Sequence, residues 1–177
     1  MPININGTTG ISGVDGSAGT PGIQGSDTNT GIFFPAADTI AFSEGGVEVM
    51  RLDSSANLQF NSGYGSVATA YGCRAWVNFN GTGTVAIRAS GNVSSITDNG
   101  TGDYTVNFTT AMPDANYGVS ATISGFFGTS YFIISTVKVK TDNTGSDLQS
   151  TTQVKLVSGN SAGTSTDVPV FNVAIFR

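Results

Sequence analysis

The sequence predicts an all-β protein with a collagen-like triple-helical neck, a short β-stalk and a C-terminal β-sandwich or jelly-roll head, assembled as a homotrimer. Glycine recurs at every third position near the N-terminus, and short alternating segments separated by turn residues follow it. Ser, Thr, Asn and Gly fill most polar positions and only 11% of the residues are charged, a mixture that favours strands and turns over helices.

Residues 1–27 comprise an N-terminal attachment segment and the glycine repeat. A three-chain polyproline-II helix needs glycine at every third residue, because only a hydrogen side chain fits at its crowded axis. A flexible linker is the alternative, but it needs no fixed period. Pro21 alone stiffens the repeat, so the contacts that hold three chains together are expected elsewhere. The regularly spaced glycines are Gly7, Gly10, Gly13, Gly16, Gly19, Gly22 and Gly25.

Residues 28–63 are predicted to form the β-stalk. Short segments with partial alternation of apolar and polar residues lie between turn sequences such as Glu44-Gly45-Gly46. A meander of about 35 residues cannot bury enough surface as a monomer, but three copies around one axis can share their apolar faces. The predicted strand segments are 31–35, 39–42, 47–52 and 58–60.

Residues 64–177 are predicted to form the head. Eight short strands without an intervening helix indicate a β-sandwich or a jelly roll. The segments 93–96 and 103–108 are expected to pair as a hairpin, and Trp76 is expected to lie in the core. The predicted strands are 74–79, 85–89, 93–96, 104–108, 118–123, 131–140, 153–157 and 169–176.

The last of these strands is apolar on both of its alternating sides, which is typical of a strand that is buried on both faces. A single sandwich buries only one face of each sheet. The strand is therefore predicted to be central in its sheet and to contact a neighbouring subunit, with Phe171 and Phe176 as candidates for the trimer interface.

Two parts of the sequence resemble phage fibre proteins. Residues 48–58 (EVMRLDSSANL) resemble a stalk unit of tail fibres, in which a strand ends in Met-Arg and a Ser-Ser-Gly-Asn turn follows; Ala56 departs from the Gly often found there. Residues 71–83 and 96–108 resemble C-terminal modules of fibre-like virion proteins from marine and freshwater tailed phages such as cyanophages, a likeness that extends over roughly 64–177. The resemblance implies a structural protein of the virion surface, assembled in the host cytoplasm.

The composition argues against several other classes of protein. The net charge is −5, and Arg51 is the one cation in the first 60 residues, so neither nucleic acid nor an anionic membrane is an expected partner. The chain has no histidine and a single cysteine, Cys73, which excludes Ser-His and Cys-His pairs, an intrachain disulfide and multi-cysteine zinc sites. Neither a secretory signal peptide nor an apolar run of about 18 residues is present.

The aspartates of the head are expected to cap turns rather than to act in catalysis. Residues 98–103 have oxygen ligands at spacings that faintly resemble a calcium loop, but they fit a hairpin turn equally well. We therefore predict no enzymatic activity, no metal site and no cofactor. The expected turn aspartates are Asp98, Asp103, Asp114, Asp142, Asp147 and Asp167.

Phe126, Phe127 and Tyr131 lie beside glycines and are candidates for contact with a glycan or protein on the host surface. Alternatively, the two phenylalanines belong to the head core or the trimer seam. Two functions remain open at this point: a tail fibre or fibre tip that binds the host surface, and a decoration fibre of the capsid or neck with a structural or weakly adhesive role. In both, the N-terminus is expected to dock onto another virion protein.

Overall fold

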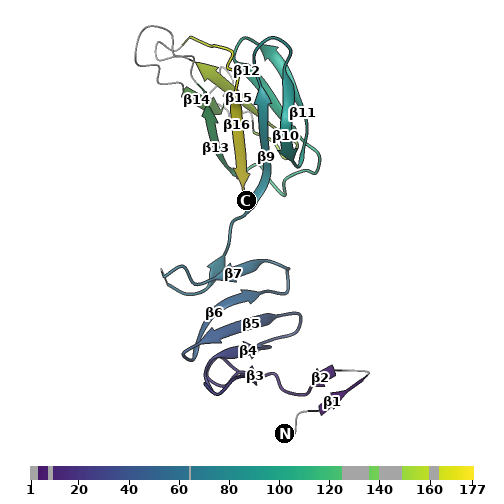
Figure 1. Ribbon diagram of the computed structural model, residues 1–177, viewed down its shortest axis with the longest axis vertical. Coiled ribbons are helices and arrows are strands. Elements are labelled where there is room, and N and C mark those ends of the chain that lie inside the picture. Colours follow the sequence, from purple (N-terminus) through teal and green to yellow (C-terminus); the bar gives the residue numbers. More distant parts are fainter. Residues whose placement is uncertain (1–3, 8–9, 64, 125–135, 140–148, 160–163) are drawn as a thin grey trace. The chain divides into compact units, whose positions relative to one another are not determined.

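The computed structural model describes residues 4–7, 10–63, 65–124, 136–139, 149–159 and 164–177, and these contain strands and turns but no helix (Figure 1). The all-β prediction is therefore confirmed. The chain divides into two compact units, Met1–Ala70 and Tyr71–Arg177. Each unit has its own antiparallel sheets, and each is described by itself below.

In the single chain, the glycine repeat does not have the extended conformation predicted for a collagen-like neck. Strand β1 (Asn4–Asn6) pairs with β2 (Gly10–Ser12), and an isolated bridge joins Gly16 to Pro21. Gly13 and Gly16 have φ of 92° and 73°, whereas a polyproline-II chain keeps φ near about −75°. A polyproline-II helix has no hydrogen bonds within one chain, so the lone chain satisfies its backbone by folding back on itself.

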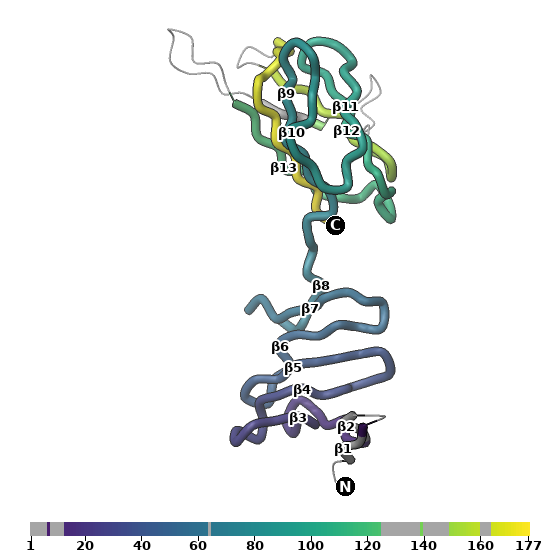
Figure 2. The backbone as a smooth tube through the Cα atoms, turned by 45° about the vertical axis from the view of Figure 1, so that its right-hand side comes forward, coloured from purple at the N-terminus to yellow at the C-terminus, as the bar shows by residue number. Residues whose placement is uncertain are grey.

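The stalk is a six-stranded antiparallel meander in which each strand pairs with the next in the sequence (Figure 2). The four predicted strand segments correspond to β4–β7, and the sheet extends beyond the predicted range 28–63 at both ends. The strands are β3 (Ile23–Gln24), β4 (Gly31–Phe33), β5 (Ile40–Glu44), β6 (Val47–Leu52), β7 (Leu58–Phe60) and β8 (Ala68–Thr69).

The turn between β5 and β6 is made by the predicted glycines. Gly45 and Gly46 have φ of 57° and 80°, the left-handed values that a two-residue hairpin turn requires. Their N–H groups donate to the hydroxyl of Thr30 at 3.2 Å and to the carbonyl oxygen of Asn29 at 2.8 Å. The turn is thereby anchored to the loop that precedes β4.

The head consists of two four-stranded antiparallel sheets that pack face to face around one core (Figures 1 and 2). Sheet 1 has the order β10-β9-β16-β13 and sheet 2 the order β11-β12-β15-β14. Each of the eight predicted segments overlaps a strand, although residues 131–135 and 140 of the predicted strand 131–140 lie outside the described residues. The predicted hairpin joins β11 to β12, and β16 is central as predicted. The strands are β9 (Cys73–Asn80), β10 (Ala86–Gly91), β11 (Val93–Gly100), β12 (Asp103–Phe108), β13 (Gly118–Ile123), β14 (Thr136–Val139), β15 (Gln153–Gly159) and β16 (Phe171–Phe176).

Three aromatic rings form the centre of the head core. Phe79 and Phe171 of sheet 1 stack with ring centroids 4.8 Å apart, and Tyr104 of sheet 2 meets each of them edge-on at 5.2 and 5.7 Å. All three side chains are fully buried. Such edge-on and stacked pairs add to the free energy already gained by removing the rings from water.

The predicted place of Trp76 in the core is wrong, because its side chain is 45% exposed. Its neighbours Ala75 and Val77 face the core, as does Phe79. Side chains alternate along a strand, so Trp76 must lie on the outer face of sheet 1. The alternation was visible in the sequence, but which side faced inward was set by the partner strand.

Tyr104 connects two loops through its hydroxyl group, which lies 2.7 Å from the carbonyl oxygen of Gly81 and 2.8 Å from a carboxylate oxygen of Asp167. The same Asp167 oxygen accepts a hydrogen bond from the N–H of Gly102 at 2.7 Å. Burial, and next the hydrogen bond to Asp167, raise the pKa of Tyr104, so the phenol stays protonated.

Replacing Tyr104 by phenylalanine is expected to lower the free energy of unfolding of the head by about 1–3 kcal/mol, because buried acceptors lose their partner while the ring remains. Urea unfolding followed by the fluorescence of Trp76, the single tryptophan, measures this loss. Tyr71→Phe is the matched control, since Tyr71 is 68% exposed and should tolerate the change. Equal midpoints for the two variants would contradict the role assigned to the buried hydroxyl.

Candidate functional site

The stalk sheet has one continuous apolar face. Residues that pair directly across neighbouring strands project from the same side of a sheet. One such row crosses all six strands and contains only apolar residues, and a shorter apolar row lies beside it. The first row is Ile23, Ile32, Phe42, Met50, Phe60 and Ala68, and the second is Ile40, Leu52 and Leu58. These nine residues are called the apolar face below.

Much of the apolar face is accessible to solvent in the single chain. Five of its large side chains, Ile23, Ile40, Leu52, Leu58 and Phe60, are 41–44% exposed. Monomeric proteins rarely leave a contiguous apolar surface of this kind in water, so such a surface marks a site of interaction. The sequence showed the alternation within each segment, whereas the alignment of the segments into rows became visible only in the sheet.

The opposite face of the same sheet differs in composition. Its rows contain Phe33 and Ala41, which are buried, followed by Arg51, Gln59 and Thr69. The guanidinium group of Arg51 forms an ion pair with Glu48, which lies on this face because the strand register shifts between Phe42 and Ser43. This ion pair raises the pKa of Arg51, chiefly through the hydrogen bond to Glu48. This face, called the polar face below, is covered within its own unit at Phe33 and Ala41 and is polar at Arg51, Gln59 and Thr69, whereas both rows of the apolar face contain only apolar residues.

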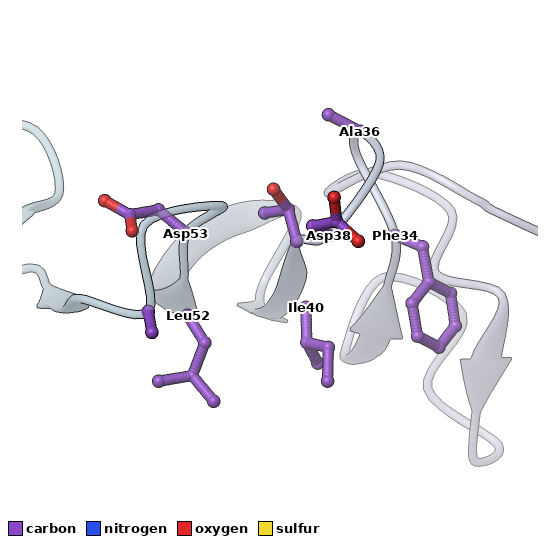
Figure 3. Close-up of a pocket in the computed structure, with 8 residues that line it drawn as sticks. Phe34, Ala36, Asp38, Ile40, Leu52 and Asp53 are labelled. Carbon is purple, nitrogen blue, oxygen red and sulfur yellow. The ribbon is translucent and has the colours of Figure 1, made fainter.

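An open hollow of about 620 Å³ adjoins the apolar face at the edge of the sheet where β4 and β6 end and β5 begins. In Figure 3 the side chains of Phe34, Ile40 and Leu52 point to one side, away from the carboxylates of Asp38 and Asp53. Aliphatic side chains that belong to the apolar rows therefore line this hollow. The hollow has the chemistry of the apolar face, without the convergent polar groups that fix a small ligand.

The turn after β6 matches the residues that resemble the phage stalk unit. One carboxylate oxygen of Asp53 accepts hydrogen bonds from the N–H groups of Ser55 and Asn57, both at 2.9 Å. The other oxygen accepts from the side-chain amide of Gln59 at 2.7 Å. The bond from the Asn57 N–H is the main reason that the pKa of Asp53 lies below its ordinary value. Ala56 has φ of 60°, which explains why a glycine suits this position.

Replacing Ala56 by glycine is expected to raise the free energy of unfolding of the stalk by about 1 kcal/mol. A left-handed φ costs an alanine about 1–2 kcal/mol, which a glycine avoids. The greater conformational freedom of glycine in the unfolded chain offsets part of this stabilisation. Differential scanning calorimetry of the full chain measures the stalk transition. Ser55→Gly is the control. Because Ser55 has no positive φ, a glycine there should lower the stability of the stalk instead. A lower melting temperature for Ala56→Gly would contradict the assigned turn.

The predicted site residues have different outcomes. Phe126, Phe127 and Tyr131 lie outside the described residues. Phe171 is fully buried in the core of its own subunit, so its assignment to the trimer interface is wrong: its side chain faces sheet 2 rather than a neighbour. Phe176 is on the opposite, outer side of β16 and is 42% exposed, so it remains a candidate for contact between copies.

Several head aspartates cap turns as predicted. A carboxylate oxygen of Asp98 accepts from the N–H of Gly100 at 2.9 Å, which makes residues 98–103 the end of the β11–β12 hairpin. Asp114 accepts from the N–H of Asn116 and pairs with Arg177, and these two contacts lower the pKa of its carboxyl group. Asp142 and Asp147 lie outside the described residues. Within the described ranges no cluster of three His, Cys, Asp or Glu side chains is placed to hold a metal ion.

The outer face of sheet 1 holds a second surface of interest. Trp76 lies beside a polar ladder in which the amide of Asn78 donates to Asn172 at 2.5 Å and the amide of Asn172 donates to Thr122 at 3.5 Å. An open hollow of about 280 Å³ lies over these residues. The sequence analysis missed this surface because it placed Trp76 in the core. The alternation of Trp76, Asn78 and Asn80 on one side of their strand is the signal that could have found it.

Among the residues that the structure describes, no helix has the length and apolar character needed to cross a membrane. Comparison with protein-family models, curated proteins and solved structures found no match to this chain.

Proposed function

We propose that this protein is a non-enzymatic structural fibre protein of a tailed-phage particle, a homotrimer that presents its head at the virion surface. The apolar face of the stalk is the observation that carries this proposal. Three copies that turn their apolar faces toward a common axis remove these rows from water and leave the polar faces outside. The described strands of this unit pair only within the one sheet, and five large side chains of its apolar face stay 41–44% exposed in the single chain.

Three chains, rather than two, are favoured by the glycine repeat. A period of three residues is the requirement of a three-chain helix, and the stalk follows it directly in the sequence. In the trimer, we expect the repeat to exchange its hairpin for a triple helix, since neighbouring chains then supply the backbone partners that a lone chain lacks. Phe176 is an additional candidate for contact between copies.

The location on a virion is supported by the resemblance of residues 48–58, 71–83 and 96–108 to phage fibre proteins. Within that class we propose a tail fibre or fibre tip that attaches the particle to the host surface, with the N-terminus docked onto another virion protein. A decoration fibre of the capsid or neck is the alternative. It has the same trimeric architecture and differs in where the fibre is mounted.

Two measurements test the proposal. Sedimentation equilibrium of the full chain should give about three times the chain mass of 18.0 kDa, and a stable monomer at micromolar concentration would overturn the trimer. Electron microscopy of virions labelled with an antibody against residues 72–177 should place the head at the tail. Label on the capsid or neck would establish the decoration fibre instead, and unlabelled particles that contain no such chain would overturn the virion assignment.

A further inference from the structure

We infer that the outer face of sheet 1 in the head is a binding site for an uncharged saccharide, centred on Trp76. This inference rests on the proposed function, because it names the ligand class and the residues through which the head would attach to a surface. Unlike Phe126, Phe127 and Tyr131, the residues of this face lie within the described part of the chain.

The site combines one aromatic platform with neutral hydrogen-bonding groups. Trp76 is 45% exposed, and Asn78, Asn172, Ser120 and Thr122 surround the same hollow. None of the residues that line it carries a charge, and the guanidinium group of Arg88, which lies beside Asn78, donates to the carbonyl oxygen of Pro169 at 2.5 Å. A sugar ring has an apolar face of C–H groups and a rim of hydroxyl groups, so it can lie on an indole while its hydroxyls exchange hydrogen bonds with amides.

Pairing across the sheet explains how these side chains come together. Gly91, Trp76, Ala174 and Ser120 form one row across the four strands of sheet 1, and Asn78, Asn172 and Thr122 lie in the next row on the same face. Because the side chain of Ala174 is small, the surface of the first row is depressed between Trp76 and Ser120. The aromatic ring and the amide ladder are therefore held on a regular sheet rather than on loops.

The orientation of the indole is fixed by Gly91. A Cβ atom at position 91 would lie 2.5 Å from the Nε1 atom of Trp76 and 2.9 Å from its Cδ1 atom. The pyrrole ring of Trp76 thus covers the backbone of Gly91, where any larger residue would push it away. Gly91 has no positive φ, so the need for glycine here comes from the indole and not from the backbone.

The amides keep capacity for a ligand. Each asparagine offers two N–H donors and a carbonyl oxygen with two lone pairs. Asn172 uses its oxygen to accept from Asn78 and one N–H to reach Thr122, and the oxygen of Asn78 lies 3.5 Å from a guanidinium nitrogen of Arg88. The ladder aligns these groups in advance and leaves further donors and lone pairs at the surface, which reduces the ordering cost of binding.

The outer face of sheet 2 provides an internal comparison. Its central rows contain Thr97, Thr105 and Lys155, and Ser95, Asn107 and Gln153. These rows have hydroxyl and amide groups and the ammonium group of Lys155, but no aromatic side chain. If hydroxyls and amides alone were sufficient, the two faces would bind sugars equally well. Binding therefore depends on the indole of Trp76 and takes place on sheet 1.

The experiment uses the full chain and immobilised polysaccharides of known charge: the neutral polymers dextran, mannan and galactan, and the anionic polymer polygalacturonate. We expect retention on at least one neutral polymer and quenching of Trp76 fluorescence by the matching methyl glycoside. Trp76→Ala should bind about tenfold more weakly, the scale of one lost aromatic contact. Gly91→Ala retains the indole and all polar groups, and it should also bind more weakly because the indole is displaced.

Thr97→Ala on the outer face of sheet 2 is the matched control and should bind as the unmodified chain does. Circular dichroism and sedimentation confirm that each variant is folded and assembled. Binding to none of the neutral polymers, preferential binding to polygalacturonate, or unchanged binding by Trp76→Ala would each overturn the inference. Loss of the trimer in Trp76→Ala would show that a neighbouring copy occupies this face, which also overturns it.

Failure of this inference is distinguishable from failure of the proposed function. A trimer that labels virions but ignores every neutral polymer contradicts the saccharide site and leaves the fibre assignment intact. A monomer that retains polymer binding through Trp76 contradicts the trimeric fibre and leaves the saccharide site intact.

Discussion

Replacing Phe171 by alanine is expected to lower the free energy of unfolding of the head by about 3–5 kcal/mol, the cost of truncating a buried aromatic side chain. Phe171 is fully buried, stacks on Phe79 at 4.8 Å and meets Tyr104 edge-on at 5.7 Å. The alanine variant leaves a cavity between the two sheets. Because the contacts lie within one subunit, the loss is expected in the subunit itself and does not require assembly.

Urea unfolding of the full chain, followed by Trp76 fluorescence at two protein concentrations, measures this effect. Phe176→Ala is the matched control: it removes the same ring from the same strand, but from an exposed position on the other face. Its midpoint should change little unless the chains are assembled through that face. A midpoint for Phe171→Ala that equals that of the unmodified chain would mean that Phe171 is not part of the core.

Replacing Leu58 by lysine should dissociate the proposed trimer. Leu58 is 43% exposed in the single chain, so a lysine there costs the monomer little. In the proposed trimer the same position would turn toward the common axis, where three unpaired ammonium groups would each lose several kcal/mol of hydration free energy. Sedimentation equilibrium at micromolar concentration should therefore give the mass of one chain, 18.0 kDa.

Thr69→Lys is the control for this substitution. Thr69 pairs with Gln59, so it lies on the polar face of the same thin sheet, and it is also exposed. It introduces the same charge one strand away from Leu58. Dissociation by both variants would indicate a general effect of charge on the stalk, and a trimer of unchanged stability with Leu58→Lys would show that the apolar face is not the assembly surface.

Much of the fold could be predicted because β-structure leaves local signals in a sequence. The turn residues Gly45 and Gly46 marked a hairpin that the structure contains, and the segments 118–123 and 47–52 became strands with those same limits. Local patterns were sufficient here because turn chemistry and alternation act over a few residues. The glycine repeat was different, since its meaning depends on how many chains are present.

The candidate site was less predictable. Trp76 was predicted in the core, but it lies on the outer face of its sheet. Phe171 was predicted at an interface between chains, but it lies in the core. Both assignments depended on which side of a strand faces the second sheet. Alternation indicates only that successive side chains point to opposite faces of the sheet. In β16 the residues on both faces are largely apolar, so the pattern did not indicate which face is buried. Burial of one side was decided by Tyr104 and Leu156, which come from strands far away in the sequence.

By itself the sequence determined that the described chain is all-β, where most of the stalk and head strands lie, and that it lacks the residues for histidine chemistry or a disulfide framework. The tertiary structure alone decided the register that aligns Ile23 through Ala68 into one apolar row, and the parity that exposes Trp76 on the same face of sheet 1 as Asn172. The physical reason is the same in both cases. A shift of one residue in pairing moves every side chain of a strand to the opposite face, and only long-range contacts fix that choice.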